Sequence, residues 1–258
     1  MGNIQNVKKA KDWLKFLEKN YSNEIKEQIK NTVSIRGDIP FLPEVKIDST
    51  EIDLYDCGTT QAVLRLNTNN FNTALLNFAS YKNPGGGFLG GAIAQEEVLC
   101  HETSLYPVIT EFKDYYNENR KKDNKHLYTN AALYTPDVLV FDKFNLKAKC
   151  DVITCAAPNV RAALRKTSME EITYILESRI DFMFSVAQLN GVEQLVLGAW
   201  GCGVFGCDPN KVSDIMLHYL NTKYKGVFKR VVFAIPNKNG ENYKAFERTI
   251  NNYKQEVK

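Results

Sequence analysis

Five short segments of the chain are apolar with no alternating polar face, and amphipathic helical segments lie between them. These segments are residues 73–78, 138–141, 152–157, 194–198 and 230–235. Strands that are apolar on both faces belong in a sheet that is covered on both sides. Strands that alternate with helices in this way predict an α/β fold. In such folds ligands bind at the loops beyond the carboxyl ends of the strands.

Helical periodicity and helix-start residues mark the segments between the strands. The expected helices cover residues 7–32, about 59–66, 94–120, 168–189, 209–222 and 241–256. Asp208-Pro209 is a typical helix start, because proline suits the first helical position. Thr59 or Thr60 is expected to cap the second helix. We expect Pro107 to divide the third segment into two helices, because proline lacks the N–H that a helix interior needs.

The chain shows no internal repeat, low-complexity tract or flexible linker. Its 258 residues suffice for one large domain, or for a domain with an extension. We expect residues 1–58 to be an extension packed on a core formed by residues 59–258. Within the extension, Ile35 to Leu54 alternates loosely and carries two prolines, which predicts short strands or an extended arm.

Charge and hydropathy exclude several classes of partner. The net charge is +3, with acids and bases mixed along the chain, whereas a sequence-specific nucleic-acid binder concentrates its basic residues. The mild positive balance suits an anionic small ligand. No apolar run is long enough to span a bilayer, so no membrane partner is expected. Residues 1–19 are charged and helical in pattern, unlike a secretory signal, which predicts a cytoplasmic, reducing location.

The cysteine and histidine residues give little reason to expect a metal. Two cysteine pairs, Cys150/Cys155 and Cys202/Cys207, share the spacing C-x4-C and could in principle hold zinc. Most zinc motifs use a shorter spacing, so we expect reduced, metal-free thiols. The three histidines do not form a metal-ligand spacing; they are His101, His126 and His218.

A glycine-rich loop follows the strand at residues 73–78. Five glycines fall within the seven residues 85–91, and the loop leads into a helix that begins near Gln95-Glu96-Glu97. Glycine lets the backbone approach a ligand, and a helix N-terminus favours anions. Adjacent glutamates diverge on a regular backbone, so only one can readily donate a proton at a cleft. The alternative is a flexible surface loop with a helix capped by both glutamates.

A second glycine-rich loop, Gly198 to Asp208, follows the strand at residues 194–198. Its glycines can form a backbone nest for a pyrophosphate. No Lys-Ser or Lys-Thr follows it, which disfavours a phosphate-binding loop of the NTP-hydrolysing type. Gly201, Gly203 and Gly206 match the G-x-G-x-x-G spacing of dinucleotide-binding folds. That alternative is weakened because no acidic residue ends a strand about 20 residues further on.

Taken together, the two loops resemble those of the bacterial-type poly(ADP-ribose) glycohydrolases, a branch of the macrodomain superfamily. The signature of that family is Gly-Gly-Gly followed six to eight residues later by Gln-Glu-Glu. Here seven residues separate Gly87 from Gln95. The resemblance extends from about Thr59 to the C-terminus. It implies a macrodomain-like mixed sheet flanked by helices, with an N-terminal helical extension.

The resemblance also implies roles for individual residues. Glu97 corresponds to the catalytic glutamate, and Glu96 to a neighbour that contacts ribose hydroxyls. Phe205 would pack on the distal ribose, beside a cradle for the pyrophosphate. The full set of expected substrate-binding residues is Asn77, Phe78, Ala79, Asn83, Gly85, Gly86, Gly87, Gln95, Gly201, Cys202, Gly203, Val204, Phe205 and Gly206. No cofactor is implied.

The resemblance therefore implies hydrolysis of the ribose–ribose O-glycosidic bond of poly(ADP-ribose), either free or attached to protein. Glu97 would act as the general acid and base. Two alternatives stay open: a hydrolase that removes single ADP-ribose units from protein or nucleic acid, and a reader that binds ADP-ribose without catalysis. A pure reader needs neither Glu96 nor Glu97, which argues against the second alternative.

Overall fold

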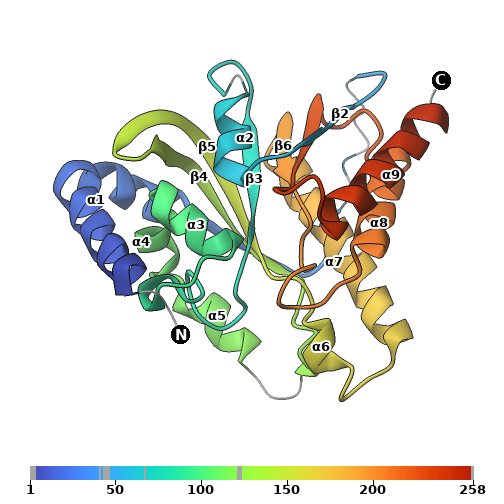
Figure 1. Cartoon of the computed structure of the whole chain (residues 1–258), viewed down its shortest axis with the longest axis horizontal. Coiled ribbons are helices and arrows are strands. Elements are labelled where there is room, and N and C mark those ends of the chain that lie inside the picture. The colour runs from blue at the N-terminus through green and yellow to red at the C-terminus, as the bar shows by residue number, and fades with distance from the viewer. Residues whose placement is uncertain (1–3, 41, 43–46, 67, 121–123, 257–258) are drawn as a thin grey trace.

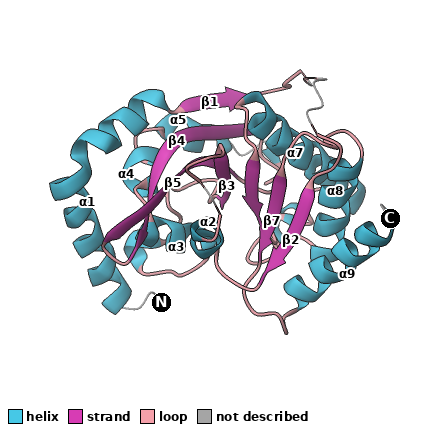
Figure 2. Ribbon diagram, turned by 90° about the horizontal axis from the view of Figure 1, so that it is seen from above, coloured by secondary structure: helices cyan, strands magenta, loops and turns pink. Residues whose placement is uncertain are grey.

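The structure is a computed structural model that describes residues 4–40, 42, 47–66, 68–120 and 124–256. These residues contain a seven-stranded sheet with the order β1-β4-β5-β3-β6-β7-β2 (Figure 2). The strands are β1 (Val33–Arg36), β2 (Glu51–Tyr55), β3 (Thr73–Phe78), β4 (Ala131–Asp142), β5 (Asn145–Cys155), β6 (Gln194–Leu197) and β7 (Arg230–Ala234).

Helices cover both faces of the sheet, as the apolar strands predict (Figure 1). They are α1 (Ile4–Asn31), α2 (Thr59–Leu64), α3 (Gln95–Glu102), α4 (Leu105–Ile109), α5 (Lys113–Asn119), α6 (Val160–Ala163), α7 (Met169–Leu189), α8 (Pro209–Asn221) and α9 (Glu241–Glu256), with a 3₁₀ turn η1 (Phe88–Gly90). Side chains alternate between the two layers. Leu75 of β3 packs in the cluster that contains Val63 of α2, and Leu76 packs in the cluster that contains Met216 of α8. None of the helices described is long and apolar enough to cross a membrane.

The sheet is mixed. β3 pairs in parallel with β5 and β6, and β7 pairs in parallel with β6 and β2. β4 is antiparallel to both of its neighbours, β5 and β1. The carboxyl ends of the six strands other than β4 therefore lie along one edge of the sheet, together with the beginning of β4. Both glycine-rich loops follow strands that end at this edge, which confirms the predicted α/β class and places the loops together.

The sheet continues across the boundary expected at residue 58. β1 and β2 come from residues before that point and form the two outer strands. The N-terminal segment is thus part of the sheet as well as packed on it through α1. Both strands are short, as the sequence predicts for this interval. Residues 1–3, 41 and 43–46 of the expected extension lie outside the described residues.

Most helix starts agree with the prediction, but the cap of α2 differs. Ser168 caps α7 by accepting a hydrogen bond from the Glu171 N–H at 3.2 Å, and Asp208 caps α8. In contrast, α2 already includes Thr59, and it is the preceding Gly58 that donates its N–H to the Gln61 side chain at 3.3 Å.

The expectation for Pro107 was wrong. Three helices occupy the stretch from residue 94 to 120, and the first break falls at Thr103, which adopts an extended conformation. Thr103 forms an isolated bridge to Val140 of β4. Pro107 is the third residue of α4, in the first turn, where its missing N–H costs no helical hydrogen bond.

Candidate active site

The first loop (residues 79–94) joins β3 to α3, and Gln95 fixes the start of that helix against the strand. The Gln95 amide nitrogen donates to the Leu76 carbonyl at 2.9 Å, and its amide oxygen accepts from the Phe78 N–H at 2.8 Å. Both ends of the Gln95 amide are therefore engaged within the chain. Gln95 thus fixes the orientation of the next two residues, and its amide is not a free donor for a ligand.

Glu96 is held from two sides. It is 3% exposed, and its Oε2 accepts from the Ser80 N–H at 2.6 Å. Its Oε1 accepts from the Asn77 side-chain amide at 3.3 Å. Burial is the largest cause that raises the pKa of Glu96 to about 8, with the charge of Glu97 acting in the same direction and the hydrogen bonds from Ser80 and Asn77 opposing it. Glu96 is therefore biased towards its neutral form at neutral pH.

Glu97 is held from one side only. It is 7% exposed, and its Oε1 accepts from the Gly87 N–H at 2.7 Å. Its Oε2 is buried and has no hydrogen-bond partner among the described residues. A buried polar atom without a partner is costly, so such atoms commonly mark a place that a ligand or water completes. Of the two carboxyl groups, Glu97 is the one with an oxygen still available.

The glycines of the first loop are required by this packing. Gly86 has a φ of +56°, and a Cβ there would collide with Oε1 of Glu97. A Cβ on Gly85, whose φ is +68°, would lie 2.5 Å from the Tyr106 ring. A Cβ on Gly87 would lie 2.8 Å from that of Ala92. Only glycine allows the loop to approach the carboxyl groups this closely.

The second loop (residues 198–208) is tight at its ends and open in its middle. Gly201 and Gly206 both have a φ of +75°. A Cβ would lie 2.7 Å from the sulfur of Cys207 at Gly201, and 2.6 Å from Cγ of Arg161 at Gly206. A Cβ on Gly203 would have no described atom within 4 Å apart from its chain neighbours, and Val204 is 74% exposed. The middle of the loop is thus free to meet a ligand.

Aromatic rings connect the two loops. The Phe205 ring centroid lies 5.7 Å from that of Tyr81 in the first loop, and Tyr81 stacks on Tyr128 at 4.0 Å. Tyr128 is 6% exposed and has a φ of +62°, an unusual conformation for an aromatic residue. Neither Tyr81 nor Tyr128 was among the residues expected from the sequence, because their contact joins positions far apart in the chain.

The sequence also missed two tyrosines of α5. Tyr115 and Tyr116 are buried, and the charge of Glu96 contributes to raising the pKa of both, after burial as the largest cause. Their hydroxyls have no hydrogen-bond partner among the described residues. Asn77 likewise has an unpartnered side-chain oxygen. Consecutive tyrosines in a helix are typical of a core, so no local signal pointed to these buried hydroxyls.

The remaining expected residues of β3 and the first loop lie in different surroundings. Phe78 points towards the second loop, with its Cζ 3.0 Å from where a Cβ on Gly198 would lie. Ala79 is buried in the cluster that contains Tyr128. Asn83 is exposed, and its side-chain oxygen accepts from Arg120 at 3.1 Å. Asn77 therefore lies beside the carboxyl pair, whereas Asn83 is engaged at the surface.

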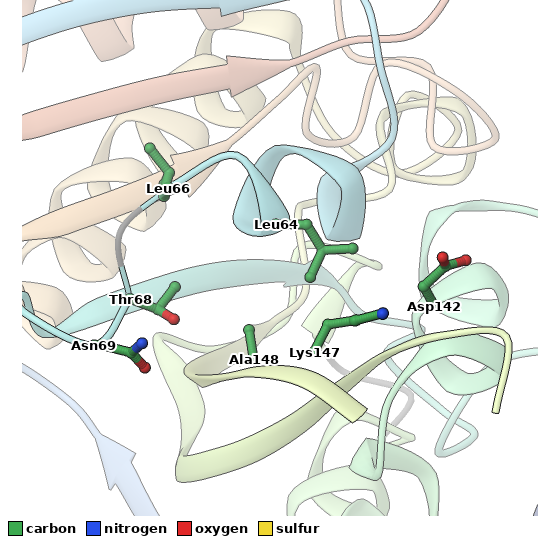
Figure 3. A pocket seen from close by; sticks show the side chains of 7 residues that line it. All are labelled: Leu64, Leu66, Thr68, Asn69, Asp142, Lys147 and Ala148. Atoms are coloured by element: carbon green, nitrogen blue, oxygen red, sulfur yellow. The ribbon is translucent and has the colours of Figure 1, made fainter. Parts of the chain in front are cut away.

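A separate cavity of about 310 Å³ lies at the opposite end of the strands (Figure 3). Its lining residues precede β3 or flank the β4–β5 hairpin, and they are Leu64, Leu66, Thr68, Asn69, Asp142, Lys147 and Ala148. It contains no residue of the expected site. Within the described part of the chain, no three His, Cys, Asp or Glu residues cluster closely enough to hold a metal ion.

Solved structures of known enzymes share this arrangement of elements. The fold matches poly(ADP-ribose) glycohydrolase from Thermomonospora curvata with a TM-score of 0.86, at 30% identity, covering 96% of this chain and 100% of that one. The same enzyme bound to the inhibitor ADP-HPD matches with a TM-score of 0.82, at 30% identity, over 95% and 99% of the two chains. Poly(ADP-ribose) glycohydrolase from Deinococcus radiodurans, in complex with ADP-ribose, matches with a TM-score of 0.80, at 31% identity, over 89% and 98%. Fold and site thus define an α/β glycohydrolase.

Residues 13–143 match the family described as microbial-type PARG, catalytic domain. The chain belongs to this family, which confirms the resemblance inferred from its two glycine-rich loops. The matched residues include the first loop and both glutamates, whereas the second loop lies beyond them. No curated protein matches the chain.

Proposed function

We propose that this chain hydrolyses the ribose–ribose O-glycosidic bond of poly(ADP-ribose) and releases ADP-ribose, with Glu97 as the general acid and base. The observation that carries the assignment to Glu97 is its Oε2, a buried carboxyl oxygen without a partner among the described residues. Family membership and the likeness to poly(ADP-ribose) glycohydrolases support the reaction.

The proposed chemistry begins with a proton on Oε2 of Glu97. The 2′-oxygen of the neighbouring unit leaves and takes this proton as its bond to the anomeric carbon breaks. Positive charge develops on the ribose as an oxocarbenium ion, and water then attacks the anomeric carbon and returns a proton to Glu97. Metal is not required for any of these steps.

We assign Glu96 to placing the ribose. Its two oxygens are already held by Ser80 and Asn77, so it is a fixed group rather than a mobile proton carrier. The neutral form favoured by burial can donate a hydrogen bond to a ribose hydroxyl. Asn77 offers an unpartnered oxygen beside it that can accept one.

We assign the second loop to the pyrophosphate. Its left-handed glycines, Gly201 and Gly206, hold the ends of the loop, and its open middle comprises Gly203 and Val204, next to the partly buried Cys202. Backbone N–H groups in such a loop can donate to phosphate oxygens. The Phe205 ring, braced by Tyr81, would pack against the distal ribose. Binding of this kind positions the anomeric carbon near Glu97.

The alternative is removal of single ADP-ribose units, which the same carboxyl pair could perform. The deciding experiment incubates the protein with poly(ADP-ribose) and, separately, with mono-ADP-ribosylated protein, and quantifies released ADP-ribose. Release from the polymer alone supports the proposal, release from the modified protein alone supports the alternative, and binding without release indicates a reader. A cytoplasmic location stays a prediction from the sequence.

A further inference from the structure

Four basic residues gather beside the Phe205 end of the second loop, and we call them the basic rim: Lys82, His126, Arg161 and Lys166. Arg161 lies directly against the loop. Its backbone N–H donates to the Phe205 carbonyl at 3.1 Å, and its side chain occupies the space where a Cβ on Gly206 would lie. The side chain is exposed, so its guanidinium is available to solvent or to a ligand.

The other three members of the rim lie close to one another. Lys82 places its ammonium 4.8 Å from the centroid of the Tyr81 ring, which in turn contacts Phe205. Lys166 and Lys82 both lower the pKa of His126, after burial as the larger cause. Lys82 acts from the first loop and Lys166 from the segment after α6. The His126 carbonyl also accepts from the N–H of Asn159, the residue before α6, at 3.0 Å, which places His126 beside that helix.

The positive charges of the rim lack an acidic partner among the described residues. Among the ion pairs of the described residues, none involves Lys82, Arg161 or Lys166. The neighbouring Lys125 differs, since it pairs with Glu171 at 2.9 Å. Like charges held together without counter-charges attract an anion strongly. The arrangement is therefore suited to a multiply charged anionic group that lies beside Phe205.

We propose that the basic rim binds the pyrophosphate of the next ADP-ribose unit of the polymer, beyond the bond that is cut. This inference rests on the proposed function, in which Phe205 packs against the distal ribose and the leaving 2′-oxygen belongs to the next unit. That unit leaves the site on the side of the distal ribose, where the rim lies. Each unit carries two phosphates, so its charge complements the rim. A mono-ADP-ribosylated protein offers no such group, and the rim therefore favours the polymer.

The test reverses two charges of the rim in the Lys82→Glu/Lys166→Glu variant. A matched control, Lys15→Glu/Lys225→Glu, makes the same change in net charge at exposed positions on α1 and after α8. Steady-state kinetics on poly(ADP-ribose) and calorimetry with free ADP-ribose are measured for both at low and moderate salt. We expect the rim variant to raise KM for the polymer by about tenfold at low salt, because charge reversal weakens steering and binding of a polyanion. Its affinity for ADP-ribose should change much less.

The milder Lys82→Gln/Lys166→Gln variant should also raise KM for the polymer, by a smaller factor. Added salt should reduce the difference in KM between each rim variant and the wild type. An unchanged KM for the polymer in both rim variants would overturn the inference. So would equal losses for the polymer and for ADP-ribose, or an equal effect in the control variant. Failure of the wild type to release ADP-ribose would instead contradict the proposed function. In that case, polymer binding by the Glu97→Gln protein, with and without the rim substitutions, tests the rim by itself.

Discussion

Two adjacent glutamates differ in what surrounds them, although they share one helical turn. Both oxygens of Glu96 accept hydrogen bonds from the chain, whereas Oε2 of Glu97 has no partner among the described residues. The sequence predicted that only one of them would serve as the acid, because neighbouring side chains diverge. It could not predict that Ser80 and Asn77 would engage Glu96, since those contacts depend on how the first loop folds back onto α3.

The Glu97→Gln variant removes the acid and keeps the shape. The glutamine oxygen can still accept from the Gly87 N–H, so the loop should hold its position. We expect turnover on poly(ADP-ribose) to fall by roughly two to four orders of magnitude, the scale for losing a general acid–base group. Affinity for ADP-ribose should stay within a few-fold of wild type. Rapid hydrolysis by a variant whose melting curve is unchanged would refute this role.

The Glu96→Gln variant should change how folding stability depends on pH. Folding raises the pKa of Glu96 from its ordinary value of 4.5 to about 8. Below about pH 4.5 the carboxyl group is neutral in both the folded and the unfolded protein, so folding buries no charge there. As pH rises from there towards 8, the unfolded chain loses its proton first and folding stability falls. Glutamine does not titrate, so the variant should gain stability relative to wild type between pH 5 and 8. Thermal melts of both proteins across this pH range test the prediction. If the melting temperatures of wild type and variant changed with pH in the same way, the prediction would be contradicted.

The same variant should also affect the reaction. A group that contacts the ribose in both the ground state and the transition state influences binding as well as turnover. We therefore expect Glu96→Gln to weaken ADP-ribose binding in calorimetry as well as to reduce kcat, whereas Glu97→Gln should reduce turnover and leave binding nearly unchanged. A loss confined to kcat would indicate that Glu96 shares the proton transfer instead of placing the sugar.

The helices, strands and loops show where local sequence is sufficient and where it is not. β3 spans the predicted residues 73–78, because a buried strand between turn residues is a strong local signal. β4 and β5 extend well beyond their predicted cores, since in the hairpin the added residues of each strand pair with the predicted core of the other. The contact of Tyr128 with Tyr81 could not be predicted, because its backbone conformation is imposed by packing between distant elements.

Two glycines of the second loop should respond differently to substitution. Gly203→Val adds bulk where nothing lies within 4 Å, so the protein should fold with an unchanged melting temperature while ADP-ribose binding weakens. Gly206→Ala meets both a φ of +75° and the Arg161 side chain, so its melting temperature should fall. Melts and calorimetry on both variants distinguish a ligand-facing position from a structural one. If the Gly203→Val variant bound ADP-ribose normally, the assignment of this loop to the pyrophosphate would be wrong.

Taken as a whole, the protein depends on its first 58 residues more than the sequence indicated. β2 pairs with β7 over five residues, and β1 pairs with β4 over four. Trp13 of α1 is 3% exposed and donates from its indole to the Thr103 carbonyl at 3.2 Å, next to the end of α3. α1 also packs in the cluster that contains Phe88 of the first loop. The N-terminal segment therefore supports the candidate site indirectly.

Removal of residues 1–58 should consequently abolish folding. The truncated chain would expose the edges of β7 and β4 and the apolar surface beneath α1, which favours aggregation. We expect residues 59–258 alone to show no cooperative thermal transition and no ADP-ribose binding. A soluble fragment with a sharp melt would show that the boundary at residue 58 separates an independent domain after all.

The stretch between the three consecutive glycines and the Gln-Glu-Glu triplet, residues 88–94, can differ in length between relatives. Its contacts with the carboxyl groups are made at Gly86 and Gly87, whereas Leu89 and Ile93 are 50% and 71% exposed. Phe88 in this stretch is fully buried against His101 and Tyr106, whereas residues 89–90 and 93–94 are exposed, so the loop can vary in length at these exposed positions without displacing either glutamate. A count of six, seven or eight intervening residues thus records tolerated insertions and deletions, and a motif search that fixes this count would overlook true relatives.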